Sequence, residues 1–415
     1  MRDVYKIKKG VKIVDLDIIS RETIKPSSPT PHHLRTFNLS ILDQYMYDIC
    51  TPMIVFFPNV KNASVKDVAT TRSKHLKETL AEILTRFYPF AGKFKNNRQI
   101  ECNDEGIYYV EARVNFFLCG GIGISTTMSH KIFDGHTYFM FMKAWASAAR
   151  GSLDTISPSF VASEMFPNNP SLEHAAPSKL IATSKLSTKR FVFDSTALAL
   201  LKKQPVANAR LGHGPTRNEA ITSIVWKAIA KASSKVRPFG PESPHLLFTS
   251  VNFRKRASPP LSDESIGNLL DTAVAICYPE RHLELPTLMS DLRESVAKVN
   301  SQKIESMKGE NGQETFSEIS RVSSQLNDVI REGDCVVASS LLNSGIYNLD
   351  FGWGKPIWFY AMNAGLARLV HLNETLKGGG VEAIVTLSPK EMEIFEHDPE
   401  MNSKAQRDLQ YKKKD

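Results

Sequence analysis

The segment SHKIFDG, from Ser129 to Gly135, carries a histidine and an aspartate four residues apart. Free imidazole has an ordinary pKa of about 6.5, so a histidine side chain can exchange a proton with a bound group near neutral pH, and His130 is a candidate for that role. The carboxylate of Asp134 could orient that ring or serve as a second base. The pair is therefore a candidate for acid–base chemistry.

Two other interpretations start from the same segment. His130, Asp134 and His136 carry side chains that can bind metals, but His130 and Asp134 share a face only within a helix, and Gly135 favours a loop. We find no further cluster of ligand residues with helical spacing, so no metal site is predicted. The remaining alternative, a core histidine beside an aspartate in a structural ion pair, stays open on spacing alone.

The elements that must position this pair follow from the neighbouring residues. The run FFLCGGIGISTTMS predicts a strand that ends at His130, and the apolar spacing over Tyr138–Ala149 predicts a helix after the loop. Upstream, RSKHLKETLAEILTRFYPFAGKF predicts an amphipathic helix that stops at Pro89, which lacks the N–H that a helix needs.

The whole chain predicts two α/β domains. Its 415 residues exceed one ordinary core, and strands and helices alternate in both halves. We place a first domain at 1–156, a crossover linker rich in Ser, Pro, Asn and Ala at 157–188, and a second domain at 189–415. Leu285–Met307 is predicted as one helix, and YNLDFGWGKPIWFYAMN with VEAIVTLS is predicted to close the second sheet.

Composition narrows the class of protein. The chain is 42% hydrophobic and 23% charged, with a net charge of +8 that is scattered along it. Its five cysteines form no CxxC pair, which favours a reducing compartment. No signal peptide, membrane-length apolar run or nucleic-acid motif is present, so a cytoplasmic protein that binds neither membrane nor nucleic acid is expected.

Several short motifs in this chain match known functional patterns but lack the neighbouring elements that those functions require. The glycine run Gly378–Gly380 precedes a predicted strand, whereas a dinucleotide-binding loop precedes a helix. The DFG of Asp350–Gly352 lacks the other kinase motifs. The chain has no GxSxG, P-loop or HExxH pattern. These absences argue against elbow-type hydrolases, P-loop NTPases and zincins.

Five segments together carry a family resemblance. In chain order they are PSSPTPHHLRTFNLSILDQ, FYPFAGKF, SHKIFDG, VNFRKR and DFGWGKP. Together they resemble the plant BAHD acyltransferases, which move an acyl group from coenzyme A to an alcohol or amine. HxxxD alone is weak, but HxxxD followed by DFGWG is specific. KPSSPTP, FLCGG and GNLLDTAVAI are most similar to the vinorine synthase-like branch, which acetylates indole and related alkaloids.

The resemblance implies a fold and a site. The fold is a two-domain, chloramphenicol acetyltransferase-like α/β sandwich, in which each domain is a mixed sheet with covering helices and the active-site channel lies between them. His130 would be the general base in that channel. Asp134 would point away and pair with Arg254, thereby orienting the loop that also holds Gly135. The DFGWG motif would be structural, with Asp350 a motif residue rather than a clear proton carrier; its other members are Phe351, Gly352, Trp353 and Gly354.

The resemblance also implies the reactants. Acetyl-CoA or another acyl-CoA would be a co-substrate, with no permanently bound cofactor and no metal. The acceptor would be a small-molecule alcohol, and the protein would be a monomer.

The chain departs from the family pattern at one place. YYVEARVNFFLCGGIGI runs straight through where several dozen residues normally intervene, so the first domain is expected to be shortened near Val114 and Asn115. SSLLNSGIYNL also replaces the Cys-Arg pair that usually precedes DFGWG. Two functions therefore stay open: an O-acetyltransferase acting on a plant specialised metabolite such as an indole alkaloid, or a catalytically impaired relative.

Overall fold

The structure, a computed structural model, describes residues 18–46, 48–60, 62–64, 67–112, 120–152, 156–171, 180–203, 214–237, 243–280, 283–309, 311–329 and 335–407. The expected shortening near Val114 and Asn115 lies outside these residues.

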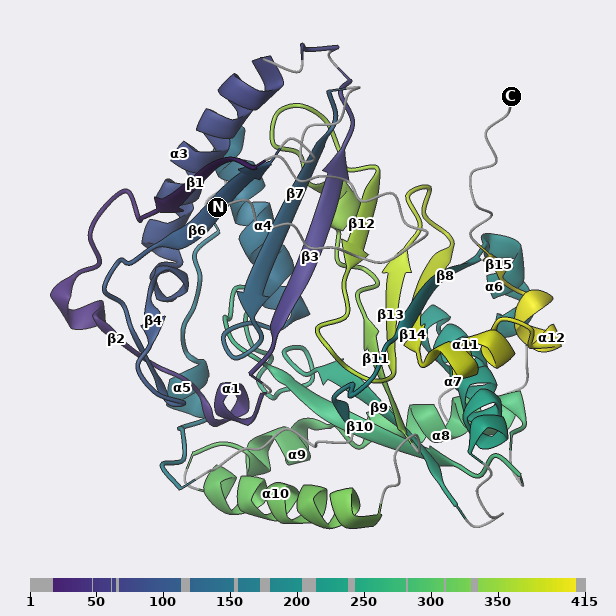
Figure 1. The fold of residues 1–415 in the computed structure, drawn as a ribbon. Helices are drawn as coiled ribbons and strands as arrows, with labels where there is room; N and C mark the ends of the chain where they lie inside the picture. The colour runs from purple at the N-terminus through teal and green to yellow at the C-terminus, as the bar shows by residue number, and fades with distance from the viewer. Residues whose placement is uncertain are drawn as a thin grey trace.

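A seven-stranded mixed sheet dominates the C-terminal half of the chain (Figure 1). Its order is β10-β9-β11-β13-β14-β8-β15, and β11 runs parallel to both neighbours while the other pairings are antiparallel. The strands are β8 (Ser187–Phe193), β9 (His245–Asn252), β10 (Leu270–Cys277), β11 (Cys335–Ser340), β13 (Leu369–Glu374), β14 (Val381–Leu387) and β15 (Gln406–Arg407). The helices are α6 (Ser195–Lys202), α7 (Arg217–Val236), α8 (Leu285–Ala297), α9 (Ser301–Ser306), α10 (Asn311–Val329), α11 (Pro389–Phe395) and α12 (Pro399–Asn402).

The two faces of this sheet differ in chemistry. Successive side chains of a strand alternate between faces. On β13, Val370 and Leu372 join the apolar core that also contains residues of α7, α8 and α11. His371 and Asn373 project from the opposite face, where Nδ1 of His371 lies 3.3 Å from the carbonyl oxygen of Ala361. That second face is therefore turned toward the N-terminal half.

Smaller antiparallel sheets make up the N-terminal half within the described residues. β1 pairs with β6, β2-β5-β4 form a second sheet, and β12-β3-β7 form the central one. The strands are β1 (Ile18–Ile24), β2 (Thr36–Asn38), β3 (Cys50–Phe57), β4 (Lys93–Phe94), β5 (Gln99–Glu101), β6 (Ile107–Ala112), β7 (Ile122–Ser129) and β12 (Trp358–Ala361). The helices are α1 (Ile41–Tyr45), α3 (Ser73–Arg86), α4 (Gly135–Ala149) and α5 (Ala162–Met165), with a π-helical turn at Val68–Arg72 and 3-10 turns at His32–Leu34 and Tyr88–Ala91.

The prediction that the segment after DFGWG closes the C-terminal sheet is wrong. Strand β12 instead pairs with β3, with Trp358 opposite Phe56 and Ala361 opposite Met53. The reason is packing: Phe359 and Ala361 are buried in the apolar core of the N-terminal half. An alternating apolar strand fits either sheet, so the pattern alone could not choose. The chain thus returns from the second half to complete the central sheet of the first (Figure 1).

The single helix predicted over Leu285–Met307 is two helices. Helix α8 ends at Ala297, and α9 begins at Ser301 because the Asn300 side chain accepts a hydrogen bond from the backbone N–H of Lys303. Asparagine is a favoured N-cap residue, since its oxygen satisfies an N–H that the new helix leaves open.

Three other boundaries are adjusted by the structure. Helix α3 ends at Arg86, and Pro89 lies in the 3-10 turn that follows it. Helix α4 begins at Gly135, earlier than predicted. The predicted linker 157–188 includes α5 and the first residues of β8.

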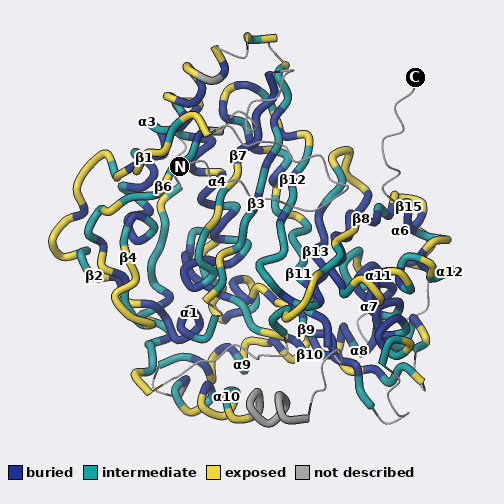
Figure 2. The backbone as a smooth tube through the Cα atoms, viewed as in Figure 1, coloured by how far each residue is buried: buried dark blue, intermediate teal, exposed yellow. Residues whose placement is uncertain are grey.

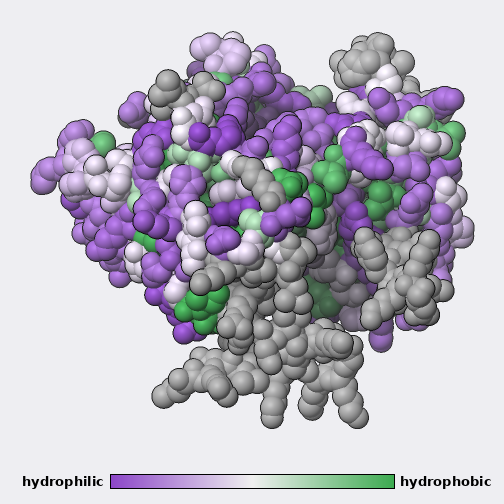
Figure 3. Space-filling model, turned by 90° about the horizontal axis from the view of Figure 1, so that it is seen from above, coloured by the Kyte–Doolittle hydropathy of each residue, from purple (hydrophilic) through white to green (hydrophobic). Residues whose placement is uncertain are grey.

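Buried and exposed residues are distributed as expected for sheets that are covered by helices. Buried residues follow the strands and the inner faces of the helices, whereas exposed stretches lie in outer loops and along α10 (Figure 2). Seen from above, the surface is largely hydrophilic, with hydrophobic residues gathered in a few places (Figure 3).

Candidate functional site

His130 lies one residue beyond the end of β7, in the turn that leads to α4. Its backbone N–H donates to the carbonyl oxygen of Ile49 at 2.8 Å, and its own carbonyl oxygen accepts from Nδ2 of Asn268 at 2.8 Å. Its ring stacks on Phe133 with centroids 5.7 Å apart. Nδ1 is buried, and neither ring nitrogen has a hydrogen-bond partner among the described residues. The backbone of this histidine is therefore fixed while its ring nitrogens stay available for chemistry.

Asp134 ends the same turn and starts α4. Its Oδ1 accepts the backbone N–H of Thr137 at 2.8 Å, which is an N-cap contact. The residue is 2% exposed, and its carboxylate bonds to Arg254 rather than to His130. Both carboxylate oxygens of Asp134 thus take part in structural hydrogen bonds, and neither of them bonds to the imidazole of His130.

Arg254, two residues after β9, completes this arrangement. Its two terminal nitrogens lie 2.7 and 3.2 Å from the two oxygens of Asp134. The guanidinium also donates to the carbonyl oxygens of Ser265 and Gly267. Burial alone would raise the pKa of Asp134, but the charge and hydrogen bonds of Arg254 hold it below its usual value. The pair joins the His130 turn to the C-terminal half.

A second buried carboxylate supports the turn from the other side. Oδ1 of Asp43, in α1, accepts both the backbone N–H and Nδ2 of Asn268 at 2.8 Å, and that same Nδ2 donates to the carbonyl oxygen of His130. Burial raises the pKa of Asp43, opposed by its bonds to Ser40 and Asn268. Sequence reasoning missed this network. The available signal was the SILD segment, a serine with an acid three residues later, which is the pattern of a helix capping box.

His371, on strand β13, lies close enough to His130 to interact with it electrostatically. Burial lowers the pKa of His371 to about 4. The bond to Ala361 partly opposes this shift, and the nearby His130 adds a still smaller lowering effect. His371 is therefore neutral at pH 7. Leu341, just after β11, makes a second connection: its N–H donates to the carbonyl oxygen of Leu372, and its side chain approaches Gly135. Sequence analysis did not single out these residues, since one histidine in an apolar strand carries no motif.

The DFGWG motif lies apart from the turn that carries His130. Oδ1 of Asp350 accepts the N–H groups of Gly352 and Gly354, which adopt φ values of +98° and +115°. Phe351 packs edge-on against Trp145 in α4, with ring centroids 5.3 Å apart. Trp145 is eleven residues from Asp134, about 16 Å along a helix. Asp350 is therefore remote from His130 and shapes a tight loop.

Trp353 lies in the same core as Phe351. Its ring stacks on that of Phe351 with centroids 5.6 Å apart, and the guanidinium of Arg72 lies 5.4 Å from its centroid. Position 354 favours glycine for two reasons. Its φ is positive, and a Cβ there would come within 3.1 Å of Val60. The motif thus belongs to the apolar core of the N-terminal half.

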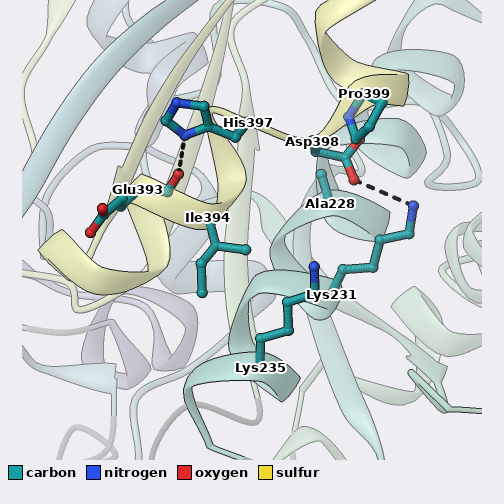
Figure 4. Close-up of a pocket in the computed structure, with 8 residues that line it drawn as sticks. All are labelled: Ala228, Lys231, Lys235, Glu393, Ile394, His397, Asp398 and Pro399. Carbon is teal, nitrogen blue, oxygen red and sulfur yellow. Dashed lines mark hydrogen bonds and ion pairs between the residues drawn. The ribbon is translucent and has the colours of Figure 1, made fainter.

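A surface pocket of about 360 Å³ is separate from this site. Residues of α7, among them Lys231, line it together with residues 393–399 (Figure 4). Lys231 reaches Asp398 at 3.4 Å, and His397 contacts the carbonyl oxygen of Glu393. These helices cover the apolar face of the large sheet, whereas His130 is near the opposite face.

The remaining candidates do not assemble a metal centre. Nε2 of His136 lies 2.7 Å from the carbonyl oxygen of Asp263. Across the described ranges, no group of three or more His, Cys, Asp or Glu residues is arranged to hold a metal ion. Over the same ranges, no helix is both long and apolar enough to cross a bilayer.

Comparisons with known proteins agree with this geometry. A family model described as the Transferase family matches residues 14–118 and 113–402. The chain is 33% identical, over 451 aligned positions, to epi-neemfruitin B 7-O-acetyltransferase of Melia azedarach, covering 94% of this chain and 98% of that protein. It is 27% identical to stemmadenine O-acetyltransferase of Catharanthus roseus, covering 92% and 96%. The crystal structure of vinorine synthase matches with a TM-score of 0.80 and 27% identity, covering 94% and 98%.

The chain therefore belongs to the Transferase family, the acyltransferases called BAHD, and it is an acyl-transferring enzyme. The predicted resemblance to the vinorine synthase-like branch is confirmed, as is the two-domain α/β fold.

Proposed function

We propose that this protein transfers an acetyl group from acetyl-CoA to a hydroxyl group of a plant specialised metabolite, such as an alkaloid or a limonoid, with His130 as the general base. The observation that carries the proposal is the state of His130: both backbone polar groups are bonded, while neither ring nitrogen is bonded among the described residues. The acetyltransferase names of relatives from Melia azedarach and Catharanthus roseus support the acetyl group and the acceptor class.

The reaction needs one base that later acts as an acid. The imidazole of His130 takes the proton of the acceptor hydroxyl as its oxygen attacks the thioester carbonyl carbon. The tetrahedral intermediate then collapses, the carbon–sulfur bond breaks, and the imidazolium returns the proton to the coenzyme A thiolate. General-base assistance of this kind accelerates a reaction by about 10²–10⁴-fold. No covalent acyl-enzyme is required, which suits a chain without a nucleophile elbow.

The other motif residues have positioning roles in this proposal. Asp134 and Arg254 hold the turn that carries His130, and Gly135 lets Leu341 approach the start of α4. The DFGWG residues fix the loop at the far end of α4 and carry no proton. Acyl-CoA is a co-substrate that binds and leaves, and no permanent cofactor takes part.

The substitution His130→Ala tests the proposal. We expect acetyl transfer to fall at least about a hundredfold, measured as coenzyme A release with a panel of hydroxylated limonoids and alkaloids, while the melting temperature changes little. His397→Ala is the matched control, because that side chain is 67% exposed and remote from the site. Retention of more than roughly a tenth of the wild-type rate in His130→Ala would remove His130 from the role.

A second candidate, a catalytically impaired relative, is favoured by two observations. The two matches to the family model overlap at residues 113–118, and the alignment to the Melia azedarach enzyme spans more positions than this chain has residues. Both findings support the expectation that a segment of the first domain is missing near Val114 and Asn115.

The two candidates differ in what an inserted segment does. Transplanting the corresponding segment of the Melia azedarach relative after Val114 should raise turnover and the melting temperature if the natural chain is impaired. Equal turnover with and without the insert would exclude the impaired relative and leave the active acetyltransferase as the remaining candidate. The His130→Ala substitution, made in both versions, shows whether any activity gained uses the same base.

A further inference from the structure

Asn373 on β13 stands out among the buried polar residues. It is 2% exposed, and both Oδ1 and Nδ2 of its side chain lack a hydrogen-bond partner in the described part of the chain. A buried amide normally bonds with both groups, because leaving them unpaired loses the hydration they had in the unfolded chain. Such an amide indicates either a missing ligand or a structural water.

The place of Asn373 points to the ligand. It shares a face of β13 with His371, two residues away, or roughly 7 Å along the strand. Nδ1 of His371, on β13, lies 3.3 Å from the carbonyl oxygen of Ala361, on β12. Figure 1 shows these two strands of different sheets near one another. Leu341 ties the neighbouring Leu372 to the start of α4, as described above. Asn373 therefore lies on the wall of the sheet that faces the His130 turn.

The surroundings of Asn373 are polar but carry no unmatched charge. Its cross-strand partner is Glu382 on β14. Both oxygens of Glu382 are engaged by Arg190, at 2.6 and 3.0 Å, and Nε1 of Trp358 lies 3.4 Å away. Glu382 is thus balanced by a bidentate cation, and His371 is neutral at pH 7. A protonated amine would find no unpaired carboxylate among these residues, whereas a neutral hydroxyl would find the amide.

We propose that Asn373 binds a second hydroxyl group of the acyl acceptor, so that the acceptor is a neutral alcohol with at least two oxygen functions. A hydroxyl both donates and accepts, which matches an amide with one free acceptor and one free donor group. This inference rests on the proposed function, because the reacting hydroxyl is the one at His130. Asn373 is accordingly a positioning and selectivity residue, and it takes no part in proton transfer.

The experiment compares two acceptors on the full chain. The first is a neutral tetracyclic diol, and the second is the same molecule with its remote hydroxyl replaced by hydrogen. For the wild type we expect kcat/KM for the diol to exceed that for the deoxy compound by about tenfold or more, since a site built to bond a hydroxyl rejects an analogue without it. In Asn373→Leu the preference should disappear through a higher KM for the diol, with the deoxy compound used as before. Asn373→Ser, which keeps a donor and an acceptor, should restore part of the preference.

Matched controls separate the possible failures. Thr188→Val alters a hydroxyl on the same sheet face that is already bonded to Thr386, at 2.9 Å, and it should leave the preference unchanged. His130→Ala should abolish turnover of both compounds while the diol still raises the melting temperature more than the deoxy compound does.

Two outcomes would overturn the inference. One is equal use of both acceptors by the wild type, which needs no variant and so does not depend on Asn373→Leu folding. The other is an equal loss for both acceptors in Asn373→Leu and in Asn373→Ser, which would make Asn373 a structural residue or the host of a water. Unaltered turnover in His130→Ala would instead refute the proposed function, whereas the comparison of the two acceptors on the wild type would still decide the role of Asn373.

Discussion

The buried ion pair between Asp134 and Arg254 should be among the most sensitive contacts of the candidate site. Its charged atoms lie 2.7 Å apart, and the side chains are 3% and 1% exposed. Removing one partner of such a pair typically destabilises a protein by about 3–5 kcal/mol, because the other charge stays buried without compensation. The hydrogen bonds of each residue indicate where in this range the loss from its substitution should fall.

The two single substitutions should differ in severity. Asp134→Asn can keep Oδ1, which accepts from both the N–H of Thr137 and Nη2 of Arg254, and loses only the contact of Oδ2 with Nη1, so it should destabilise by about 3 kcal/mol. Arg254→Met leaves the carboxylate buried with only its N-cap contact, and it also removes the guanidinium donors to the carbonyl oxygens of Ser265 and Gly267, so it should destabilise by about 5 kcal/mol. The double variant removes both charges and should lose clearly less than the sum.

Thermal unfolding and kinetics are the measurements. A loss of about 3 kcal/mol corresponds to a fall in melting temperature of roughly 6–12 °C for a domain of this size. Turnover per folded molecule should also fall, by about tenfold to a hundredfold, since a small displacement of His130 spoils its geometry. Glu78→Gln is the control, because its contact with Lys74 is exposed and worth less than about 1 kcal/mol. Strictly additive losses in the double variant would refute the coupling.

The same pair gives a pH dependence of definite sign. Burial raises the pKa of Asp134, but Arg254 outweighs it and holds that pKa below 3.8. A carboxyl with a lowered folded-state pKa stabilises the protein above its unfolded pKa, and this stability is lost as the pH falls through the folded pKa. The difference in unfolding free energy between wild type and Asp134→Asn should therefore be constant above about pH 5 and shrink below about pH 4. A difference in urea midpoints that shrinks near neutral pH would contradict this assignment.

Two further predictions concern the supports at either end of α4. Asn268→Ala removes the donor to the carbonyl oxygen of His130 and should lower kcat about tenfold with little change in KM; an unchanged kcat would show that the turn holds without it. Asp350→Asn keeps an oxygen for the N–H groups of Gly352 and Gly354 and should leave turnover unaltered, whereas Asp350→Ala should lower the melting temperature. A large loss of turnover in Asp350→Asn, with normal stability, would restore Asp350 as a proton carrier.

Much of the local structure near the site was predictable, because the signals are strong and short-range. The strand before His130 and the helix after Asp134 follow from apolar spacing, and the N-cap role of Asp134 accounts for where α4 begins. The Asp134–Arg254 contact, by contrast, joins residues 120 positions apart. No spacing rule reaches that far, so only the family resemblance suggested it.

The misses have physical causes as well. Helix α10 was not predicted because its segment, NGQETFSEISRVSSQLNDV, is rich in Ser and Asn, which have low helix propensity. The placement of β12 depended on which apolar core it joins, and that is a tertiary choice. His371 and Asn373 alternate with Val370 and Leu372 in β13, a pattern that predicts a solvent-exposed polar face. Their polarity became informative only once the structure showed that this face is buried as well.

The expected shortening precedes strand β7 in the sequence, whereas the turn that carries His130 follows it. The residues near Val114 and Asn115 lead into β7 at Ile122, whereas His130 follows its other end, about 25 Å away for an extended strand. Between these ends β7 is paired with β3 along its whole length, from Ile122 opposite Phe57 to Ser129 opposite Cys50. Beyond the strand, Ile49, Asn268 and Arg254 hold the turn through hydrogen bonds. If the chain proves inactive, the cause should therefore be lost stability or a lost binding surface, and not a displaced His130.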